Sequence, residues 1–255
     1  EELMKPLLEV KNISKTFRRY GQPDFLALDD ISFSLYPGET LGIVGESGSG
    51  KSTVAKSVIR LLDVSKGQIF LNGEEITHAE GQAKRKLYQS IQMVFQYPFN
   101  SFDPRRTLGH GISESLINQG FSKAQASAKT EELLQQCGLD ASFARRYPFE
   151  VSGGQCQRAG IARALAIEPQ ILICDEATSA LDVTIQAQII ALLRQIKQEK
   201  GMSYLFICHD LALVQSFCDR VLVMSEGKVV EAGTPDEIIM APQSDYTRQL
   251  IDAVL

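Results

Sequence analysis

The segment GESGSGKS, residues 45–52, has the spacing G-x-x-x-x-G-K-[ST] of a phosphate-binding loop. Its glycines let the backbone curl so that successive N–H groups point at phosphate oxygens, and the helix expected to follow adds the partial positive charge of its N-terminus. Lys51 can then reach the β- and γ-phosphates of a nucleotide, and Ser52 can ligate magnesium. The candidate nucleotide-binding residues are Gly45, Glu46, Ser47, Gly48, Ser49, Gly50, Lys51, Ser52 and Thr53. This motif alone is compatible with kinases, small GTPases, helicases and transporter ATPases.

An apolar run that ends in two acids, ILICDE at 171–176, has the character of a buried strand. Such a strand can deliver Asp175 beside the phosphate loop, where its carboxylate would hold magnesium. Glu176, one residue further along, could orient or deprotonate the water that attacks the γ-phosphate. The alternative is a solvated acidic turn after a strand, which the presence of a phosphate loop makes the weaker interpretation.

A second candidate anion site lies in VSGGQ, residues 151–155. Ser152 is a good N-cap for the helical run that follows. Gly153 and Gly154 leave backbone amides exposed at the N-terminus of that helix, where N–H groups bind anions such as phosphate. The chain therefore contains a second segment suited to phosphate.

Apolar runs alternate with helical patterns around these motifs, and they predict a mostly parallel sheet with crossover helices. Their continuous apolar character indicates strands that are covered on both faces. The candidate strands are residues 40–44, 91–95, 171–174, 204–208 and 221–224. Residues 7–35 and 67–72 alternate apolar and polar positions and predict an antiparallel sheet. We expect an α/β fold, in which a P-loop NTPase core carries an antiparallel β subdomain and an inserted α-helical subdomain at about 101–166.

The C-terminal part of the chain has its own pattern. We expect a hairpin-like turn at Gly227 and Lys228, between two apolar stretches, and a short helix that begins with the capping sequence TPDE at Thr234. A last helix is predicted at about 244–254. We expect these elements to belong to one domain over residues 1–255.

Composition restricts the classes of function open to the chain. Its 255 residues are 44% hydrophobic and 22% charged, with a net charge of −5. Because this gives no overall basic field, we expect no nucleic-acid partner. The sequence shows neither an apolar window of about eighteen residues nor a signal-like N-terminus, so we expect the chain neither to span a membrane nor to be exported. The five cysteines form no Cys-x-x-Cys pair, which favours reduced thiols over disulfides or a zinc site.

Taken together, these motifs resemble those of ABC-type ATPases, whose signature segment is usually Leu-Ser-Gly-Gly-Gln. Val151 stands in place of the Leu here and keeps an apolar side chain. The resemblance implies the ABC ATPase fold, with ATP and magnesium as ligands. It also implies a dimer, because in that family the signature of one subunit closes over the γ-phosphate held by the phosphate loop of the other. The signature residues are Ser152, Gly153, Gly154 and Gln155.

Further positions match motifs of this family in the expected order. Gln96 matches the Q-loop glutamine, which in the family contacts magnesium and the attacking water and couples the site to the membrane partner. Asp182, at the end of the stretch SALD, matches the D-loop at the dimer interface. His209 matches the switch histidine that contacts the γ-phosphate. The aromatic residue that stacks on adenine is best matched by Phe17, with Tyr20 as a second choice.

Three local features resemble the ATPases of peptide and nickel importers. They are NSFDPRRT at 100–107, the long stretch CHDLALVQSFCDRVLVMSEGKVVEAGT at 208–234 and the ending SDYTRQLIDAVL at 244–255. The resemblance implies a peripheral ATPase at the cytoplasmic face of a bacterial plasma (inner) membrane. It also implies two permease subunits as partners and, indirectly, an extracytoplasmic solute-binding protein. The second ATPase subunit is expected to be a different chain, although a homodimer is chemically possible.

The cargo stays open, because selectivity in this group lies in the binding protein and the membrane channel. We expect uptake of peptides, nickel or a metal–chelator complex. The alternatives are the ATPase of an exporter and a soluble ABC protein that acts on ribosomes or DNA. Ribosome-associated members usually carry two ATPase units in one chain, and DNA-repair members carry zinc modules or long coiled coils. The sequence shows neither feature.

Overall fold

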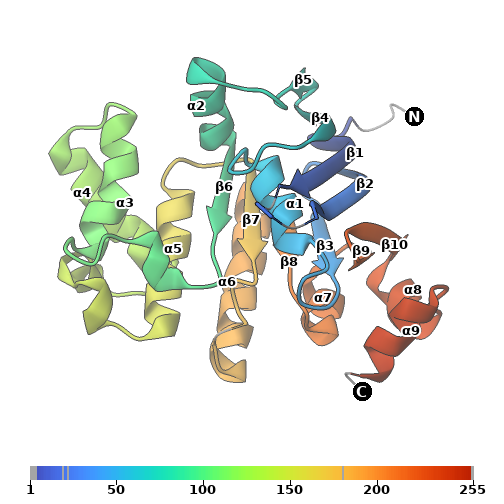
Figure 1. Cartoon of the computed structure of the whole chain (residues 1–255). Coiled ribbons are helices and arrows are strands. Elements are labelled where there is room, and N and C mark those ends of the chain that lie inside the picture. Colours follow the sequence, from blue (N-terminus) through green and yellow to red (C-terminus); the bar gives the residue numbers. More distant parts are fainter. Residues whose placement is uncertain (1–4, 19, 22, 180, 254–255) are drawn as a thin grey trace. The chain divides into compact units, whose positions relative to one another are not determined.

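The computed structural model describes residues 5–18, 20–21, 23–179 and 181–253. The chain divides into two compact units. Unit 1 comprises residues 1–88 and 200–255, and unit 2 comprises residues 89–199. The chain leaves unit 1 within α2 (Gly81–Ser90) and returns to it at the end of α6 (Val183–Lys200). Figure 1 labels the elements of both units.

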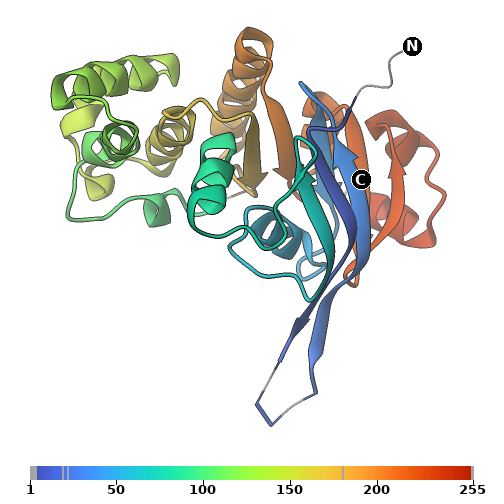
Figure 2. The same cartoon turned by 90° about the horizontal axis from the view of Figure 1, so that it is seen from above.

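Unit 1 contains an antiparallel sheet with the strand order β2-β1-β4-β5. Its strands are β1 (Leu8–Phe17), β2 (Phe25–Leu35), β4 (Lys66–Leu71) and β5 (Glu74–Glu75). Figure 2 shows β1 and β2 side by side as two long strands. Leu8 of β1 lies opposite both Leu35 and Leu71, and all three leucines are buried. The alternation of apolar positions thus turns one face of this sheet inward, as the sequence predicted.

Unit 1 also contains a mainly parallel sheet in which β3 (Thr40–Val44) is central. It pairs in parallel with β8 (Ser203–Ile207) on one side and with β9 (Arg220–Ser225) on the other. β10 (Lys228–Gly233) then pairs antiparallel with β9. Every residue of β3 and β8 is buried, because helices cover these strands. Among them, α1 (Lys51–Val58) contacts β2 and β8, and α7 (Leu211–Phe217) contacts β3.

The C-terminal part of unit 1 follows the expected hairpin and helices with small differences. The turn of the hairpin is Glu226–Gly227, with φ values of 47° and 78°, one residue earlier than predicted. Lys228 instead pairs with Ser225 in the sheet. Thr234 caps α8 (Pro235–Met240) through a capping box with Glu237. The last helix, α9 (Asp245–Asp252), is shorter than predicted, and Val254 lies outside the described residues.

Unit 2 contains a parallel pair of strands and a group of helices. The strands are β6 (Ile91–Val94) and β7 (Ile171–Asp175), and α6 follows β7 in the chain. The helices α3 (Leu108–Asn118), α4 (Lys123–Gln136) and α5 (Gly153–Leu165) contact one another (Figure 1). Three 3₁₀ turns accompany them, at Pro98–Ser101, Ala141–Arg145 and Pro148–Glu150. The predicted helical subdomain at about 101–166 contains α3, α4 and α5, and its boundaries stay a prediction.

Composition predicted that the chain has no membrane-spanning segment and that its thiols are reduced. None of the helices in the described part of the chain is long and apolar enough to cross a membrane. All five cysteines are buried and none is in a disulfide.

Candidate active site

The phosphate loop lies between β3 and α1, and three of its glycines have a backbone conformation that other residues rarely adopt. Gly45, Gly48 and Gly50 have φ values of 149°, 86° and 105°. A Cβ atom on Gly45 would lie 2.1 Å from the carbonyl oxygen of Met224 in β9. A Cβ atom on Gly50 would lie 2.8 Å from the carbonyl oxygen of Ala27 in β2. The loop is therefore pressed against two strands at positions where only glycine fits.

Lys51 begins α1 and turns its side chain back into the loop. The residue is 4% exposed, and its Nζ donates hydrogen bonds to the carbonyl oxygens of Gly45 at 2.8 Å and Glu46 at 2.7 Å. Its contact with the Ser49 hydroxyl is longer, at 3.4 Å. An ammonium group offers three N–H donors. The long contact is the one that a phosphate oxygen can most readily replace.

The first turn of α1 has the features that a phosphate group requires. The N-cap residue Gly50 makes no side-chain cap, so the first N–H groups of this helix lack a capping side chain. Residues 46–48 are exposed, and a Cβ atom on Gly48 would meet no atom within 4 Å. Ser52 and Thr53 lie half-buried in the same turn. The loop therefore fits a nucleotide phosphate at its outer side.

Three other predicted site residues belong to unit 1. His209 follows β8 and is exposed, next to Asp210, whose carboxylate caps α7. Phe17 ends β1 and is half-buried, with Nζ of Lys15 lying 5.1 Å from the centroid of its ring. Tyr20 is fully exposed. The roles assigned to His209 at the γ-phosphate and to Phe17 at adenine stay predictions.

Unit 2 brings Gln96 and Glu176 together. Nε2 of Gln96 donates a hydrogen bond of 2.7 Å to Oε2 of Glu176 and one of 3.2 Å to the hydroxyl of Ser179. The Ser179 hydroxyl donates in turn to the carbonyl oxygen of Glu176 at 3.0 Å. Both the side chain and the backbone of Glu176 are therefore held. Glu176 has a φ of 49°, a left-handed conformation that is uncommon for a glutamate and is often found at functional sites.

Asp175 is the last residue of β7 and is 7% exposed. Burial and, to a smaller extent, the negative charge of Asp175 together raise the pKa of the neighbouring Cys174 thiol to about 12. No group of three or more His, Cys, Asp or Glu residues that could hold a metal occurs in the described ranges. That finding is compatible with magnesium, which is usually bound by one or two protein oxygens together with substrate phosphates.

The signature segment begins α5 in the way its sequence predicts. The Ser152 hydroxyl accepts a hydrogen bond from the N–H of Gln155 at 3.3 Å, and the Gln155 side chain accepts one from the N–H of Ser152 at 3.0 Å. Gly154 is buried against α6, because a Cβ atom there would lie 2.7 Å from Cγ2 of Ile185. Ser152 is exposed, so the N-terminus of this helix is open to a ligand.

Asp182 of the D-loop acts locally as a helix cap. Its Oδ1 accepts a hydrogen bond of 2.9 Å from the N–H of Ile185 in the first turn of α6. Ala180 of the same motif lies outside the described residues. Because Ile185 also lies beside Gly154, the first turn of α6 connects the D-loop to the signature helix.

One residue close to the phosphate loop was not identified from the sequence. The hydroxyl of Tyr246 in α9 accepts a hydrogen bond of 2.9 Å from the backbone N–H of Glu46. Tyr246 lies in the C-terminal segment that resembles peptide and nickel importers, but no pattern there indicates a contact with a loop 200 residues earlier in the chain. Only the folded structure reveals it.

Comparison with known proteins defines the class. Residues 28–179 match the family described as ABC transporter, which is more than half of the chain. A solved structure of the ATP-binding cassette MJ0796, a dimer in a post-hydrolysis state bound to ADP and Pi, is similar with a TM-score of 0.81 at 28% identity. That similarity covers 89% of this chain and 98% of the cassette. The chain belongs to the ABC transporter family, and it has the ABC ATPase fold.

Relatives narrow the description within that family. The oligopeptide transport ATP-binding protein OppF of Streptococcus mutans is 44% identical over 99% of this chain and 83% of its own length. OppF of Escherichia coli is 44% identical over 98% of this chain and 78% of its own length. The glutathione import ATP-binding protein GsiA of Pectobacterium atrosepticum is 44% identical over 98% of this chain but only 41% of its own length. The chain is the subunit of an ABC importer that binds and hydrolyses ATP.

Proposed function

We propose that this chain is one of two ATPase subunits that drive the uptake of oligopeptides. The similarity to OppF proteins from several bacteria supports the peptide class, and glutathione, the cargo named for GsiA, is itself a small peptide. Nickel and metal–chelator complexes stay untested predictions. None of the described residues of the candidate ATPase site favours an exporter or a protein that acts on ribosomes or DNA.

One observation carries the mechanism. The chain offers two separate backbone sites for phosphate, the loop at residues 45–53 with its buried Lys51 and the exposed N-terminus of the signature helix at Ser152. We propose that the first binds the phosphates of ATP and that Ser152, Gly153, Gly154 and Gln155 close over the γ-phosphate of ATP held by a second subunit. A lone monomer should therefore bind ATP and hydrolyse it poorly.

We assign the chemistry of hydrolysis to unit 2. Glu176 orients or deprotonates the attacking water, and Gln96 holds the Glu176 carboxylate through its 2.7 Å hydrogen bond. Gln96 belongs to the Q-loop and bonds to this carboxylate. It is therefore suited to couple hydrolysis to the membrane partner. We propose further that Asp182 acts at the dimer interface, that His209 contacts the γ-phosphate and that Phe17 stacks on adenine.

Magnesium is the metal that these residues suit. Ser52 offers a hydroxyl oxygen from unit 1, and unit 2 offers the carboxylate of Asp175 and the amide oxygen of Gln96, all of them hard oxygen donors. When bound, the ion would neutralise charge on the β- and γ-phosphates.

The proposed partners follow from the importer assignment. They are a second, different ATPase subunit, two permease subunits and, indirectly, an extracytoplasmic solute-binding protein. We place the assembly at the cytoplasmic face of a bacterial plasma membrane. ATP-driven closure of the ATPase dimer, and its opening after hydrolysis, would move the permeases between outward and inward states.

Reconstitution tests the cargo class. This chain, its partner ATPase and the two permeases are incorporated into liposomes, and ATP hydrolysis is measured in the presence of the solute-binding protein of the same transporter. Oligopeptides should stimulate hydrolysis several-fold, and a nickel–chelator complex should not. Stimulation by the nickel complex alone would overturn the peptide assignment and leave the ATPase assignment intact.

A further inference from the structure

The Gly45–Glu46 peptide of the phosphate loop is held on both of its edges. Its carbonyl oxygen, that of Gly45, accepts the 2.8 Å hydrogen bond from Nζ of Lys51. Its N–H, that of Glu46, donates the 2.9 Å hydrogen bond to the hydroxyl of Tyr246. Because C=O and N–H point in opposite directions within the plane of a trans peptide, Tyr246 and Lys51 hold opposite edges of one rigid plane.

This arrangement links the orientation of Lys51 to the C-terminal helix. If the hydroxyl of Tyr246 fixes the N–H, the carbonyl at the other edge of the plane is fixed as well, and with it one of the acceptors that hold the Lys51 ammonium group. Glu46 contributes the second acceptor through its own carbonyl oxygen at 2.7 Å. The same loop is held a second time by the C-terminal part of the chain, since the N–H of Gly227 donates to the carbonyl oxygen of Ser49 at 3.0 Å.

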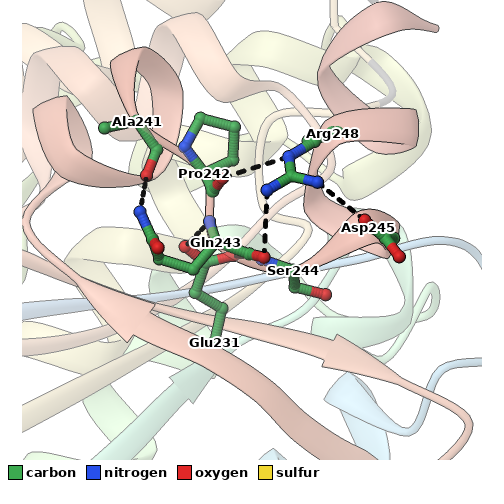
Figure 3. Close-up of polar contacts among 7 residues, drawn as sticks. All are labelled: Glu231, Ala241, Pro242, Gln243, Ser244, Asp245 and Arg248. Atoms are coloured by element: carbon green, nitrogen blue, oxygen red, sulfur yellow. Dashed lines mark hydrogen bonds and ion pairs between the residues drawn. The ribbon is translucent and has the colours of Figure 1, made fainter.

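Glu231 of β10 holds the helix that carries Tyr246. Its Oε1 accepts a hydrogen bond from the N–H of Gln243 at 2.8 Å, and its Oε2 accepts one from the N–H of Ser244 at 3.0 Å (Figure 3). These two N–H groups belong to the connection between α8 and α9. One carboxylate on β10 therefore fixes the start of α9, two residues before Tyr246.

Arg248 closes the same cluster from within α9. Its guanidinium group donates to Oδ1 of Asp245 at 2.7 Å and to the carbonyl oxygens of Pro242 and Gln243 at 3.3 Å each (Figure 3). Burial acts to raise the pKa of Glu231, but the N–H groups of Gln243 and Ser244 and the charge of Arg248 lower it overall. Glu231 is accordingly ionised at neutral pH, the state in which it accepts these hydrogen bonds most strongly.

We propose that Tyr246 is a positioning residue for ATP binding, which pre-orients Lys51 through the Gly45–Glu46 peptide. The hydrogen bonds of Glu231 and Arg248 to the connection between α8 and α9, here called the Glu231 cluster, fix Tyr246 in place. Removal of the hydroxyl leaves the peptide held at its carbonyl edge alone, so that part of the binding energy of ATP must be used to order the loop. The inference rests on the assignment of residues 45–53 as the ATP phosphate site.

Titration calorimetry of the full chain with ATP and magnesium tests this role. Tyr246→Phe should raise the Kd for ATP about threefold to tenfold, the effect of one lost hydrogen bond. The stoichiometry should stay unchanged, whereas a variant that merely folds less completely would bind fewer equivalents of ATP at an unchanged Kd. Tyr36→Phe is the matched control, because Tyr36 precedes β3 at the end away from the loop and packs its ring under Arg220. It should bind ATP like the wild type.

Two more variants separate the possible failures. Glu231→Gln keeps Tyr246 but removes one of the two oxygen acceptors in the Glu231 cluster. It should therefore raise the Kd for ATP, as Tyr246→Phe does. Lys51→Ala tests the underlying assignment: if it binds ATP as tightly as the wild type, the loop is not the phosphate site. If Lys51→Ala is weakened while Tyr246→Phe and Glu231→Gln both keep the wild-type Kd, only the positioning role is overturned. An equal rise of Kd in Tyr36→Phe also overturns it.

Discussion

The side-chain amide of Gln96 lies 2.7 Å from the carboxylate of Glu176 and donates a hydrogen bond to it. The residues are 80 positions apart in sequence and follow the two neighbouring strands β6 and β7. Parallel strands bring their carboxyl ends to the same edge of a sheet, which explains how a glutamine and a glutamate from distant segments come to meet. Ser179 completes the contact by bonding to both residues.

Gln96→Ala should lower kcat about tenfold and leave the KM for ATP within about twofold, because Glu176 keeps its carboxylate but loses the donor that orients it. ATP hydrolysis by the assembled transporter measures both constants. Gln119→Ala, an exposed glutamine just after α3, is the matched control and should behave as the wild type. An unchanged kcat in Gln96→Ala would remove the orienting role.

Ser152→Ala separates the structural and functional roles of the signature serine. The variant should lose about 1 kcal/mol of stability, the usual effect of a lost N-cap, and most of its ATPase activity. Ser122→Ala is its matched control, because Ser122 caps α4 through the same kind of capping box with Gln125. It should lose similar stability, measured by urea unfolding, and keep its activity. Equal loss of activity in both variants would assign the effect to folding.

Gly154→Ala tests the contact between the signature helix and α6. A Cβ atom there would lie 2.7 Å from Cγ2 of Ile185, so the variant should be destabilised by about 1–3 kcal/mol. Gly160→Ala on the same helix meets no atom within 4 Å and should be neutral or stabilising by up to about 1 kcal/mol. Urea unfolding of the two variants measures the difference, and the same midpoint for both would contradict the close contact of Gly154 with Ile185.

The buried thiol of Cys174 should make stability depend on alkaline pH. Burial raises the pKa of this thiol to about 12, whereas the pKa of a cysteine in the unfolded chain is about 8.5. Between these values the unfolded state loses the proton and the folded state keeps it, so the free energy of unfolding falls as the pH rises. From pH 8.5 to pH 10 the contribution is about 2 kcal/mol. In urea unfolding, the free energy of unfolding of Cys174→Ala should fall by that much less than the wild type over this pH range. An identical fall in the variant and the wild type would refute the contribution of this thiol.

The sequence predicted the parts of this molecule that depend on local pattern. The apolar runs at β3, β7 and β8 predicted those strands to within one or two residues, because buried parallel strands must be continuously apolar. The helix caps at Ser152 and Thr234 were also predicted, and the structure shows that the residue three positions later completes a capping box in each case. The motif order then indicated the family that the comparisons establish.

Contacts between distant residues could not be predicted in the same way. The bond between Tyr246 and Glu46 depends on where the last helix lies on unit 1, and that is fixed by Glu231 rather than by any motif near either residue. The contact of Gly154 with Ile185 likewise depends on how two helices of unit 2 pack. The sequence also predicted the hairpin turn one residue late, because both Glu226 and Gly227 adopt positive φ and only the glycine is recognisable as a turn residue.

The most direct test of the central claim is the ATPase activity of Glu176→Gln in the assembled transporter. The substitution keeps the size of the side chain and removes its capacity to act as a base. ATP binding should stay close to that of the wild type, and kcat should fall by at least about a hundredfold. Turnover at the wild-type rate would contradict the assignment of Glu176 and, with it, the mechanism proposed for this subunit.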